Sequence, residues 1–305
     1  MTQDPDFSGK VALVTGGARG IGYAIAHEFV RLGASVVVAD DGVAIDGSAP
    51  DASVALEAAR QLGVRAVAFS DDISAEGAAQ VAVELAQQRF GALDFVVNNA
   101  AILRDGFIFK LAQSDWDAVL RVNLSGAFRV LAAATPVLRE AAKQARAPGR
   151  VVNIVSSAGL YGNVGTGPYA ASKGGLLALT RVVAQEMMRS GVTCNAIAPF
   201  AATRVTQSLP PTLQSYKERA LRVPAEPVAK LVAYLCAPSA QHITGQLLGV
   251  RGREIMLFSQ PRPLQRALLN EGGFNELARI VGSDMMPLFT DLNTDLEAFN
   301  TDPAI

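Results

Sequence analysis

Hydrophobic residues gather in short, almost unbroken runs, which alternate with longer stretches where apolar residues recur every three or four positions. The short runs are rich in valine and isoleucine, which favour β-strands. We predict seven strands, over residues 10–15, 34–39, 65–69, 93–98, 150–156, 192–198 and 246–250. The longer stretches have the period of amphipathic helices. We predict helices near residues 20–32, 52–62, 74–89, 114–145, 169–189 and 226–236.

This alternation predicts the fold class. Because the strands are apolar on both faces, helices are expected to cover both sides of a parallel sheet. The simplest architecture is an α/β, doubly wound Rossmann-type sheet of seven parallel strands. A long polar loop at 40–53 interrupts the alternation, and beyond about residue 255 the predicted strands stop. We expect a single domain, 1–254, and a C-terminal extension, 255–305, that packs on the domain or on a neighbouring subunit.

Composition and charge narrow the possible functions. Half of the 305 residues are hydrophobic and 18% are charged, which predicts a sizeable buried core. Twenty-seven basic residues stand against 28 acidic ones, so the net charge of −1 offers nucleic acid no basic field, and we predict no nucleic-acid partner. There is no run of about 18 apolar residues and no signal-peptide pattern. We therefore expect no membrane association and a cytoplasmic location.

Cysteine and histidine are scarce. Cys194 and Cys236 cannot build a disulfide framework and suit a reducing compartment. Cys194 stands in an apolar strand and is expected to be an inert core residue. His27 and His242 are the only histidines and lie far apart, so we predict no metal site.

The stretch "TGGARGIG" (15–22) connects the first predicted strand to the first helix. Gly16 and Gly20 allow a tight turn and close backbone approach, and Gly22 lets the helix pack near the strand. A pyrophosphate can then bind at the positive N-terminus of the helix. Three glycines alone also fit a structural turn, but their place between strand and helix favours a dinucleotide site.

Asp40 ends the second predicted strand, where a carboxylate can accept hydrogen bonds from the ribose hydroxyls of an adenosine. A 2′-phosphate there would meet a like charge, at a cost of about 3 kcal/mol per charge pair at roughly 5 Å and an effective dielectric of about 20. This predicts NAD as the cofactor, with NADP disfavoured. Arg19 in the glycine loop is a possible phosphate partner and argues the other way. Alternatively, Asp40 simply begins the loop that follows.

In "PYAASKGGLLAL" (168–179), Tyr169 and Lys173 are one helical turn apart and share a face. Such a pair can be an ordinary surface contact. It can also be an acid and its activator, because a cation about 4 Å from the phenol favours the phenolate by up to about three pKa units. These residues alone leave both roles open, and the second role predicts a pKa of Tyr169 lowered toward neutrality.

Together with "NNAA" (98–101), "NAIAP" (195–199) and a serine thirteen residues before "YAASK", these stretches resemble the short-chain dehydrogenase/reductase family over roughly residues 8–252. Within it, "NNAAILRD" (98–105), "GLYGNVG" (159–165) and "TRVTQSLPP" (203–211) resemble the (3R)-hydroxyacyl-CoA dehydrogenase part of peroxisomal multifunctional enzymes and their bacterial relatives. Bacterial 3-oxoacyl carrier-protein reductases and several steroid dehydrogenases share much of this second pattern.

The resemblance implies roles for matching positions. Tyr169 matches the acid/base, and Lys173 matches the residue that binds the nicotinamide ribose. Ser156 matches the hydroxyl that binds the substrate oxygen, with Ser157 as the alternative if the register shifts by one. Asn123 matches the asparagine that holds a proton-relay water, although it can instead satisfy backbone groups inside its helix. The remaining expected cofactor contacts are Gly16, Arg19, Gly20, Ile21, Gly22, Asp40, Asp72, Ile73, Asn99, Ala100, Ala101, Pro199 and Thr203.

Two positions depart from the family pattern. Ala101 and Phe200 stand where the family usually has glycine, which alters the expected fit around the cofactor and the substrate entrance. Residues 200–224 are expected to form a mobile substrate lid. Its basic residues either meet CoA phosphates or form a solvated face; they are Arg204, Lys217, Arg219 and Arg222.

The resemblance implies an NAD-dependent oxidoreductase that acts on a secondary alcohol or ketone, here a (3R)-3-hydroxyacyl-CoA. One alternative is a steroid or small cyclic alcohol dehydrogenase with the same chemistry. Another is a dinucleotide-sensing binding protein without catalysis. The resemblance also implies a homo-oligomer, a tetramer or dimer formed through the long helices at 114–145 and 169–189.

Overall fold

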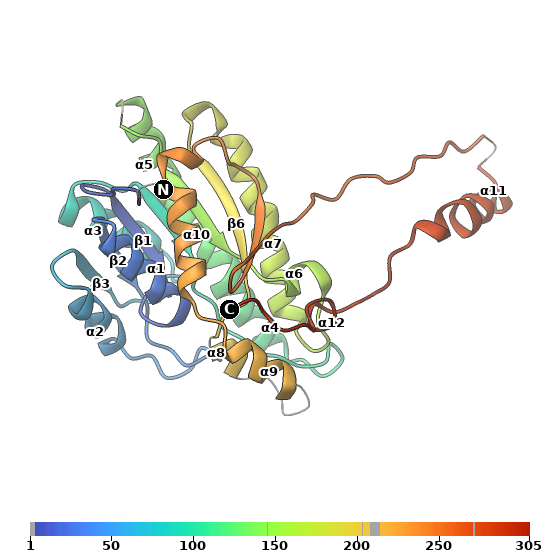
Figure 1. The fold of residues 1–305 in the computed structure, drawn as a ribbon, viewed down its shortest axis with the longest axis horizontal. Coiled ribbons are helices and arrows are strands. Elements are labelled where there is room, and N and C mark those ends of the chain that lie inside the picture. The colour runs from blue at the N-terminus through green and yellow to red at the C-terminus, as the bar shows by residue number, and fades with distance from the viewer. Residues whose placement is uncertain (1–3, 145, 203, 208–213, 271) are drawn as a thin grey trace.

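A computed structural model describes residues 4–144, 146–202, 204–207, 214–270 and 272–305. Within these residues, eight strands form one sheet in the order β3-β2-β1-β4-β5-β6-β7-β8 (Figure 1). The strands are β1 Val11–Thr15, β2 Ser35–Ala39, β3 Ala66–Phe69, β4 Phe95–Asn98, β5 Arg150–Ile154, β6 Thr193–Pro199, β7 Leu247–Arg251 and β8 Glu254–Leu257. Strands β1 to β7 are parallel and match the seven predicted strands, so the predicted fold class is confirmed.

The structure adds an eighth strand to the seven predicted ones, at the expected end of the sheet near residue 255. β8 pairs with β7 in antiparallel register, with Val250 opposite Ile255. A tight turn joins the two strands at Gly252, whose φ of +58° favours glycine. The run "EIML" has only four residues and lies half exposed at the sheet edge, so its hydrophobic pattern is too short to identify a strand.

Helices cover both faces of the sheet (Figure 1). Their bounds are α1 Gly20–Arg31, α2 Ser53–Leu62, α3 Ala78–Phe90, α4 Gln113–Leu120, α5 Ala127–Lys143, α6 Ala158–Tyr161, α7 Gly167–Glu186, α8 Arg204–Gln207, α9 Gln214–Leu221 and α10 Glu226–Cys236. Helices α1, α2 and α10 enclose one hydrophobic core with the sheet, and α3, α5 and α7 enclose the other. Because side chains alternate along a strand, Val14 enters the first core and Leu13 the second.

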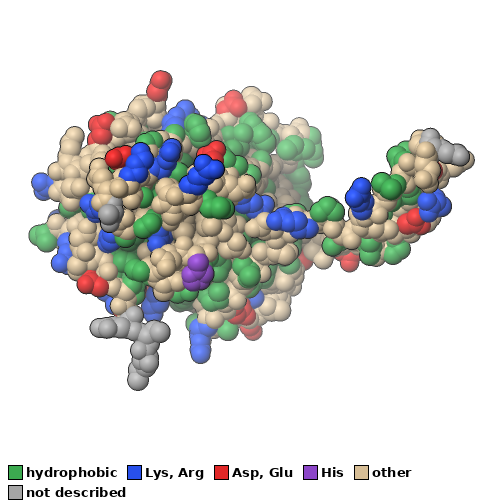
Figure 2. Space-filling view, turned by 90° about the horizontal axis from the view of Figure 1, so that it is seen from above, with side chains coloured by type: hydrophobic (Ala, Val, Ile, Leu, Met, Phe, Trp, Pro, Cys, Tyr) green, Lys and Arg blue, Asp and Glu red, His purple; other side chains and the backbone are tan. Residues whose placement is uncertain are grey.

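Beyond β8 the chain leaves the body and later returns to it (Figure 1). Residues 261–270 and 272–293, here called the arm, stand clear of the body (Figure 2). The arm contains α11 Phe274–Arg279, the π-helical turn η5 Ile280–Met285 and the 3-10 turn η6 Met286–Leu288. Residues 294–305, here called the strap, begin with α12 Asp295–Ala298 and pack on the body. Among the described residues, no helix combines the length and apolar character needed to cross a membrane.

Candidate active site

A cavity of about 660 Å³ lies at the carboxyl ends of the parallel strands, where the strand order reverses between β1 and β4. Open α/β sheets bind ligands at such a switch point. Of the predicted site residues that the structure describes, all but Asn123 line this cavity. The remaining predicted contact, Thr203, lies outside the described residues. The fold thus brings together side chains that are far apart in the sequence.

The glycine loop forms one wall of the cavity. Gly16 has a φ of +60°, and a Cβ there would lie 2.8 Å from the Cα of Ala100. At Gly22, a Cβ would lie 2.6 Å from the side-chain nitrogen of Asn99. Gly20 differs, because its φ of +54° requires glycine while nothing lies within 4 Å of the Cβ position. The start of α1 therefore exposes backbone that a pyrophosphate can approach closely.

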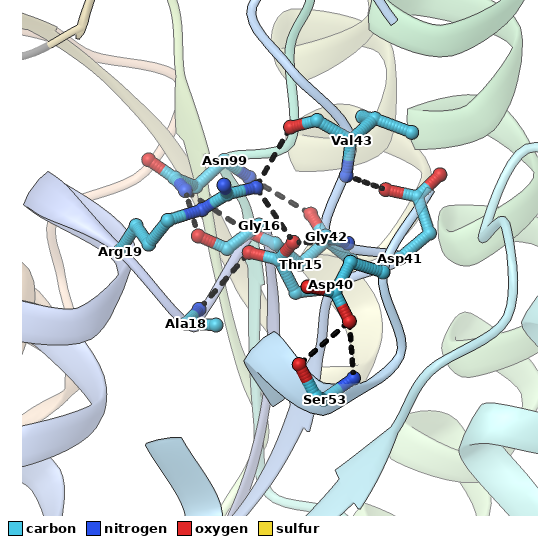
Figure 3. A network of polar contacts seen from close by, with 11 residues as sticks. Thr15, Gly16, Ala18, Arg19, Asp40, Asp41, Gly42, Val43, Ser53 and Asn99 are labelled. Atoms are coloured by element: carbon cyan, nitrogen blue, oxygen red, sulfur yellow. Dashed lines mark hydrogen bonds and ion pairs between the residues drawn. The ribbon is translucent and has the colours of Figure 1, made fainter. Parts of the chain in front are cut away.

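Asp40 is fixed between the glycine loop and the turn after β2 (Figure 3). One carboxylate oxygen accepts a 3.1 Å hydrogen bond from the Ala18 N–H, and the other accepts one of 2.9 Å from the Gly42 N–H. Arg19 reaches the same carboxylate at 3.5 Å and donates to the Val43 carbonyl at 2.8 Å. Arg19 is thus held on the loop after β2, and Asp40 keeps a defined orientation at the adenosine end of the cavity.

Asp72 and Asn99 line the same cavity after β3 and β4, respectively. Burial opposes ionisation of Asp72, but hydrogen bonds from Ser74 and Arg121 outweigh it and lower its pKa. Asn99 donates to the carbonyl oxygens of Thr15 and Gly16 at 3.0 and 2.9 Å, which ties the end of β4 to the glycine loop. These contacts hold the cradle rigid. Its shape and open backbone fit a nicotinamide dinucleotide.

Tyr169 and Lys173 project into the cavity from α7, as predicted. The Lys173 ammonium donates a 2.7 Å hydrogen bond to the Ile154 carbonyl and lies 5.8 Å from the centroid of the Tyr169 ring. Burial lowers the pKa of Lys173 to about 8. Burial also raises the pKa of Tyr169 to about 12, against a lowering contribution from the hydrogen bond with Ser156. The expected lowering of the Tyr169 pKa is therefore wrong for this structure, because the loss of solvation raises the pKa more than the Ser156 hydrogen bond lowers it.

The two neighbouring serines have different partners. Ser156 hydrogen-bonds the side chain of Tyr169 and accepts a 3.2 Å hydrogen bond from the Ala158 N–H. Ser157 is buried and donates to the carboxylate of Asp295 in the strap. The geometry therefore favours Ser156, and not Ser157, as the hydroxyl beside the acid/base.

Asn123 is buried in the π-helical turn η1, Arg121–Gly126, which joins α4 to α5 inside the predicted helix at 114–145. Its side-chain oxygen accepts a 2.8 Å hydrogen bond from the Ile102 N–H, and its nitrogen donates at 3.0 Å to the Ile102 carbonyl. It also donates to the Ser172 hydroxyl at 3.3 Å. The Asn123 side chain thus satisfies the backbone of Ile102, which lies after β4 and outside the helix that carries Asn123.

One wall of the cavity combines residues that the sequence singled out with residues of the strap that it did not indicate. Pro199 and Phe200 line it at the end of β6, and the rings of Phe200 and Phe299 lie 4.5 Å apart between centroids. The strap adds Asp295 and Phe299 to this wall. The pattern "TDLE" (294–297) signals a capped helix, but no local pattern shows that this helix reaches a serine 138 residues earlier.

The amino-acid sequence of this chain is similar to those of known proteins. A family model described as short chain dehydrogenase matches residues 10–214. Hydroxyacyl-CoA dehydrogenase ChsB1 of Mycobacterium tuberculosis is 40% identical over 271 residues, which cover 87% of this chain and 84% of that protein. Peroxisomal multifunctional enzyme A of Dictyostelium discoideum is 38% identical over 235 residues, covering 76% of this chain and 50% of that protein.

A solved structure is similar in fold. The 3-ketoacyl-(acyl-carrier-protein) reductase from Brucella melitensis, complexed with NADH, superposes with a TM-score of 0.73 at 27% identity. The match covers 81% of this chain and 99% of that one. The predicted resemblance is therefore confirmed, both in its motifs and in its three-dimensional arrangement.

Proposed function

Because the chain belongs to the short-chain dehydrogenase/reductase family and is an oxidoreductase of hydroxyl or keto groups, we propose that it transfers a hydride between NAD(H) and a (3R)-3-hydroxyacyl-CoA or its 3-oxo product. The observation that carries the proposal is the meeting of Ser156, Tyr169 and Lys173 in the same cavity as the glycine loop. The similarity to a hydroxyacyl-CoA dehydrogenase supports the substrate class.

In the reducing direction, the Tyr169 hydroxyl donates its proton to the substrate oxygen. A phenol with a pKa of about 12 is protonated at neutral pH and is suited to this step. In the oxidising direction the phenolate is needed, and the nearby Lys173 ammonium favours it. The Ser156 hydroxyl hydrogen-bonds the same oxygen and stabilises its developing charge. The nicotinamide dinucleotide supplies the hydride acceptor or donor.

NAD is proposed over NADP because of Asp40. Its carboxylate is buried, oriented by two backbone N–H groups and directed to the adenosine end of the cavity. A cofactor phosphate placed there would lie beside a fixed negative charge. Arg19 offsets this charge only in part, since the nitrogen 3.5 Å from Asp40 also donates to the Val43 carbonyl.

A homo-oligomer and a cytoplasmic location are also proposed. The arm exposes large apolar side chains, among them Phe274, Phe289 and Leu292, which a second copy would cover. Both cysteines are free and buried, in keeping with a reducing compartment.

Residues 200–224 are proposed as the substrate lid. In this segment, Arg219 and Arg222 contact the strap.

The proposal is tested by steady-state assays with NAD and NADP over three substrate panels: 3-hydroxyacyl-CoA thioesters of both configurations, hydroxysteroids, and simple secondary alcohols. We expect the highest kcat/KM for a (3R)-hydroxyacyl-CoA with NAD. A kcat/KM for hydroxysteroids or cyclic alcohols that is higher by about tenfold or more would show that the substrate class is wrong. The proposed reaction chemistry would be unaffected. NADH binding without turnover in any panel would favour a dinucleotide-sensing protein.

A further inference from the structure

The strap first passes the substrate half of the cavity and then ends beside the turn between β7 and β8. It begins at a capping box, in which Thr294 accepts a 3.3 Å hydrogen bond from the Glu297 N–H and Glu297 accepts one of 2.8 Å from the Thr294 N–H. This cap fixes the single turn α12 and therefore the directions of the side chains on it. Asp295, Leu296 and Phe299 all line the cavity.

Asp295 joins the strap to the loop that carries the reacting groups. Its carboxylate accepts a hydrogen bond from Ser157, the residue after Ser156, and its N–H donates to the Asn163 side chain at 3.2 Å. Asp295 is 5% exposed, and its second carboxylate oxygen has no hydrogen-bond partner among the described residues. The buried Asp295 carboxylate therefore repels negatively charged groups, and it favours a hydrogen-bond donor or an uncharged group beside it.

Phe299 supplies an apolar surface next to this carboxylate. Its ring meets Tyr161 edge-on at 5.9 Å between centroids and Phe200 at 4.5 Å. Phe200 is the position where the family resemblance leads one to expect glycine. The larger side chain at the end of β6 is therefore matched by an aromatic ring that comes from the strap.

The end of the strap is anchored on two further elements. Arg251 of β7 donates to the Thr301 hydroxyl at 2.9 Å, and the Arg253 N–H donates to the Ala304 carbonyl at 2.8 Å. On the proposed lid, Arg222 pairs with Asp302 at 2.9 Å. The strap is thus held against the sheet edge as well as at the cavity.

We propose that the strap is a wall of the substrate site. In this role Phe299 is a specificity-determining residue that limits the bulk of the substrate beyond its reacting carbon, and Asp295 is a positioning residue that holds Ser156 through Ser157. The inference rests on the proposed function for its substrate class. It adds that the part of the substrate facing the strap is compact and carries no negative charge, so the CoA phosphates face the cavity mouth.

Phe299→Ala tests the wall. With 3-oxoacyl-CoA thioesters, we expect kcat/KM for a branched acyl chain to rise relative to a straight four-carbon chain by about fivefold or more. The Kd for NADH should change by less than about twofold, because Phe299 is not among the expected cofactor contacts. The matched control is Tyr234→Ala, which truncates a half-exposed aromatic residue of α10 outside the cavity lining.

An unchanged selectivity ratio in Phe299→Ala, or an equal change in Tyr234→Ala, overturns the proposal. If the wild-type enzyme turns over no acyl-CoA, the proposed function fails. The strap is then tested with straight-chain and cyclic secondary alcohols, for which the same change in ratio is expected. The two failures are therefore distinguishable.

Asp295→Ala and Asp295→Asn test the positioning role. Asparagine keeps an acceptor for Ser157, so we expect it to retain kcat within about threefold, while alanine lowers kcat by about tenfold or more. Both variants remove one of the charges that face Tyr169, the others being Lys173 and Asp105. The pH midpoint for oxidation should fall in both. Wild-type kcat and an unchanged pH profile in Asp295→Ala contradict the role.

Discussion

At the residue scale, the site depends on the buried Lys173 and the half-buried Tyr169, and the charged forms of both are disfavoured. Burial raises the pKa of Tyr169 to about 12 and lowers that of Lys173 to about 8. The sequence predicted which residues meet, because a tyrosine and a lysine four positions apart share one helical face. It did not predict the direction of the tyrosine shift, because burial and the nearby carboxylates Asp105 and Asp295 depend on segments far apart in the sequence.

Replacing Lys173 with methionine should change how stability depends on pH. A lysine with a folded-state pKa of about 8, against 10.5 in the unfolded chain, opposes folding in its charged form. Its stabilising contribution is present above pH 10.5 and is lost as pH falls through 8. The free energy of unfolding in urea should therefore rise by about 2 kcal/mol more in wild type than in Lys173→Met between pH 8 and 10. Parallel pH curves for the two proteins would show that the ammonium is well solvated.

Asp40→Asn should weaken the preference for NAD. The amide keeps one acceptor for the Ala18 and Gly42 N–H groups but loses the negative charge, so kcat/KM for NAD relative to NADP should fall by about tenfold. The control is Asp51→Asn, an exposed carboxylate that bonds Ser53 at 2.6 Å outside the cavity lining. Equal NAD-to-NADP ratios of kcat/KM in wild type and Asp40→Asn would show that Asp40 does not set the cofactor preference.

At the scale of elements, hydrophobic patterning predicted all seven parallel strands because they are apolar, and all but the edge strand β3 are largely buried on both faces. It missed β8, a short edge strand, and it merged α4, η1 and α5 into one helix. A π-helical turn differs from an α-helix by one extra residue per hydrogen-bonded turn, which a pattern of apolar positions cannot separate. The turn matters because Asn123 lies in it.

Asn123→Ala should reduce stability as well as any activity. It leaves both the N–H and the carbonyl of Ile102 without their partner in a buried position. We expect the free energy of unfolding to fall by about 2 kcal/mol or more. Urea denaturation and NADH turnover are measured on the same preparation. Unchanged stability with a large loss of kcat would assign Asn123 to a proton relay instead.

At the scale of the whole molecule, the C-terminal extension was expected to pack on the domain or on a neighbour, and its two parts differ. The strap packs on the body, whereas the arm stands away from it (Figures 1 and 2). The sequence showed short amphipathic fragments in this extension. It did not show where they pack, because contacts such as that of Ser157 with Asp295 join residues 138 positions apart.

Charges placed on the arm should reduce the oligomeric state. Phe274 is 84% and Phe289 64% exposed, so aspartate at both positions costs the isolated subunit little and disrupts an apolar interface. Sedimentation velocity should show a lower mass for the double variant Phe274→Asp, Phe289→Asp, with NADH binding retained. Val64→Asp, at a position 99% exposed on the body, is the control. The same mass for all three proteins would leave the arm without a role in assembly.

The most direct measurement is the single-turnover rate of hydride transfer to bound NAD in Tyr169→Phe, with Tyr234→Phe as a matched loss of a phenol outside the cavity. If the Tyr169 hydroxyl exchanges the proton with the substrate oxygen, Tyr169→Phe should be slower by about a hundredfold or more, with the Kd for NADH little changed. Tyr234→Phe should match wild type. A Tyr169→Phe rate within about tenfold of wild type would contradict the central claim.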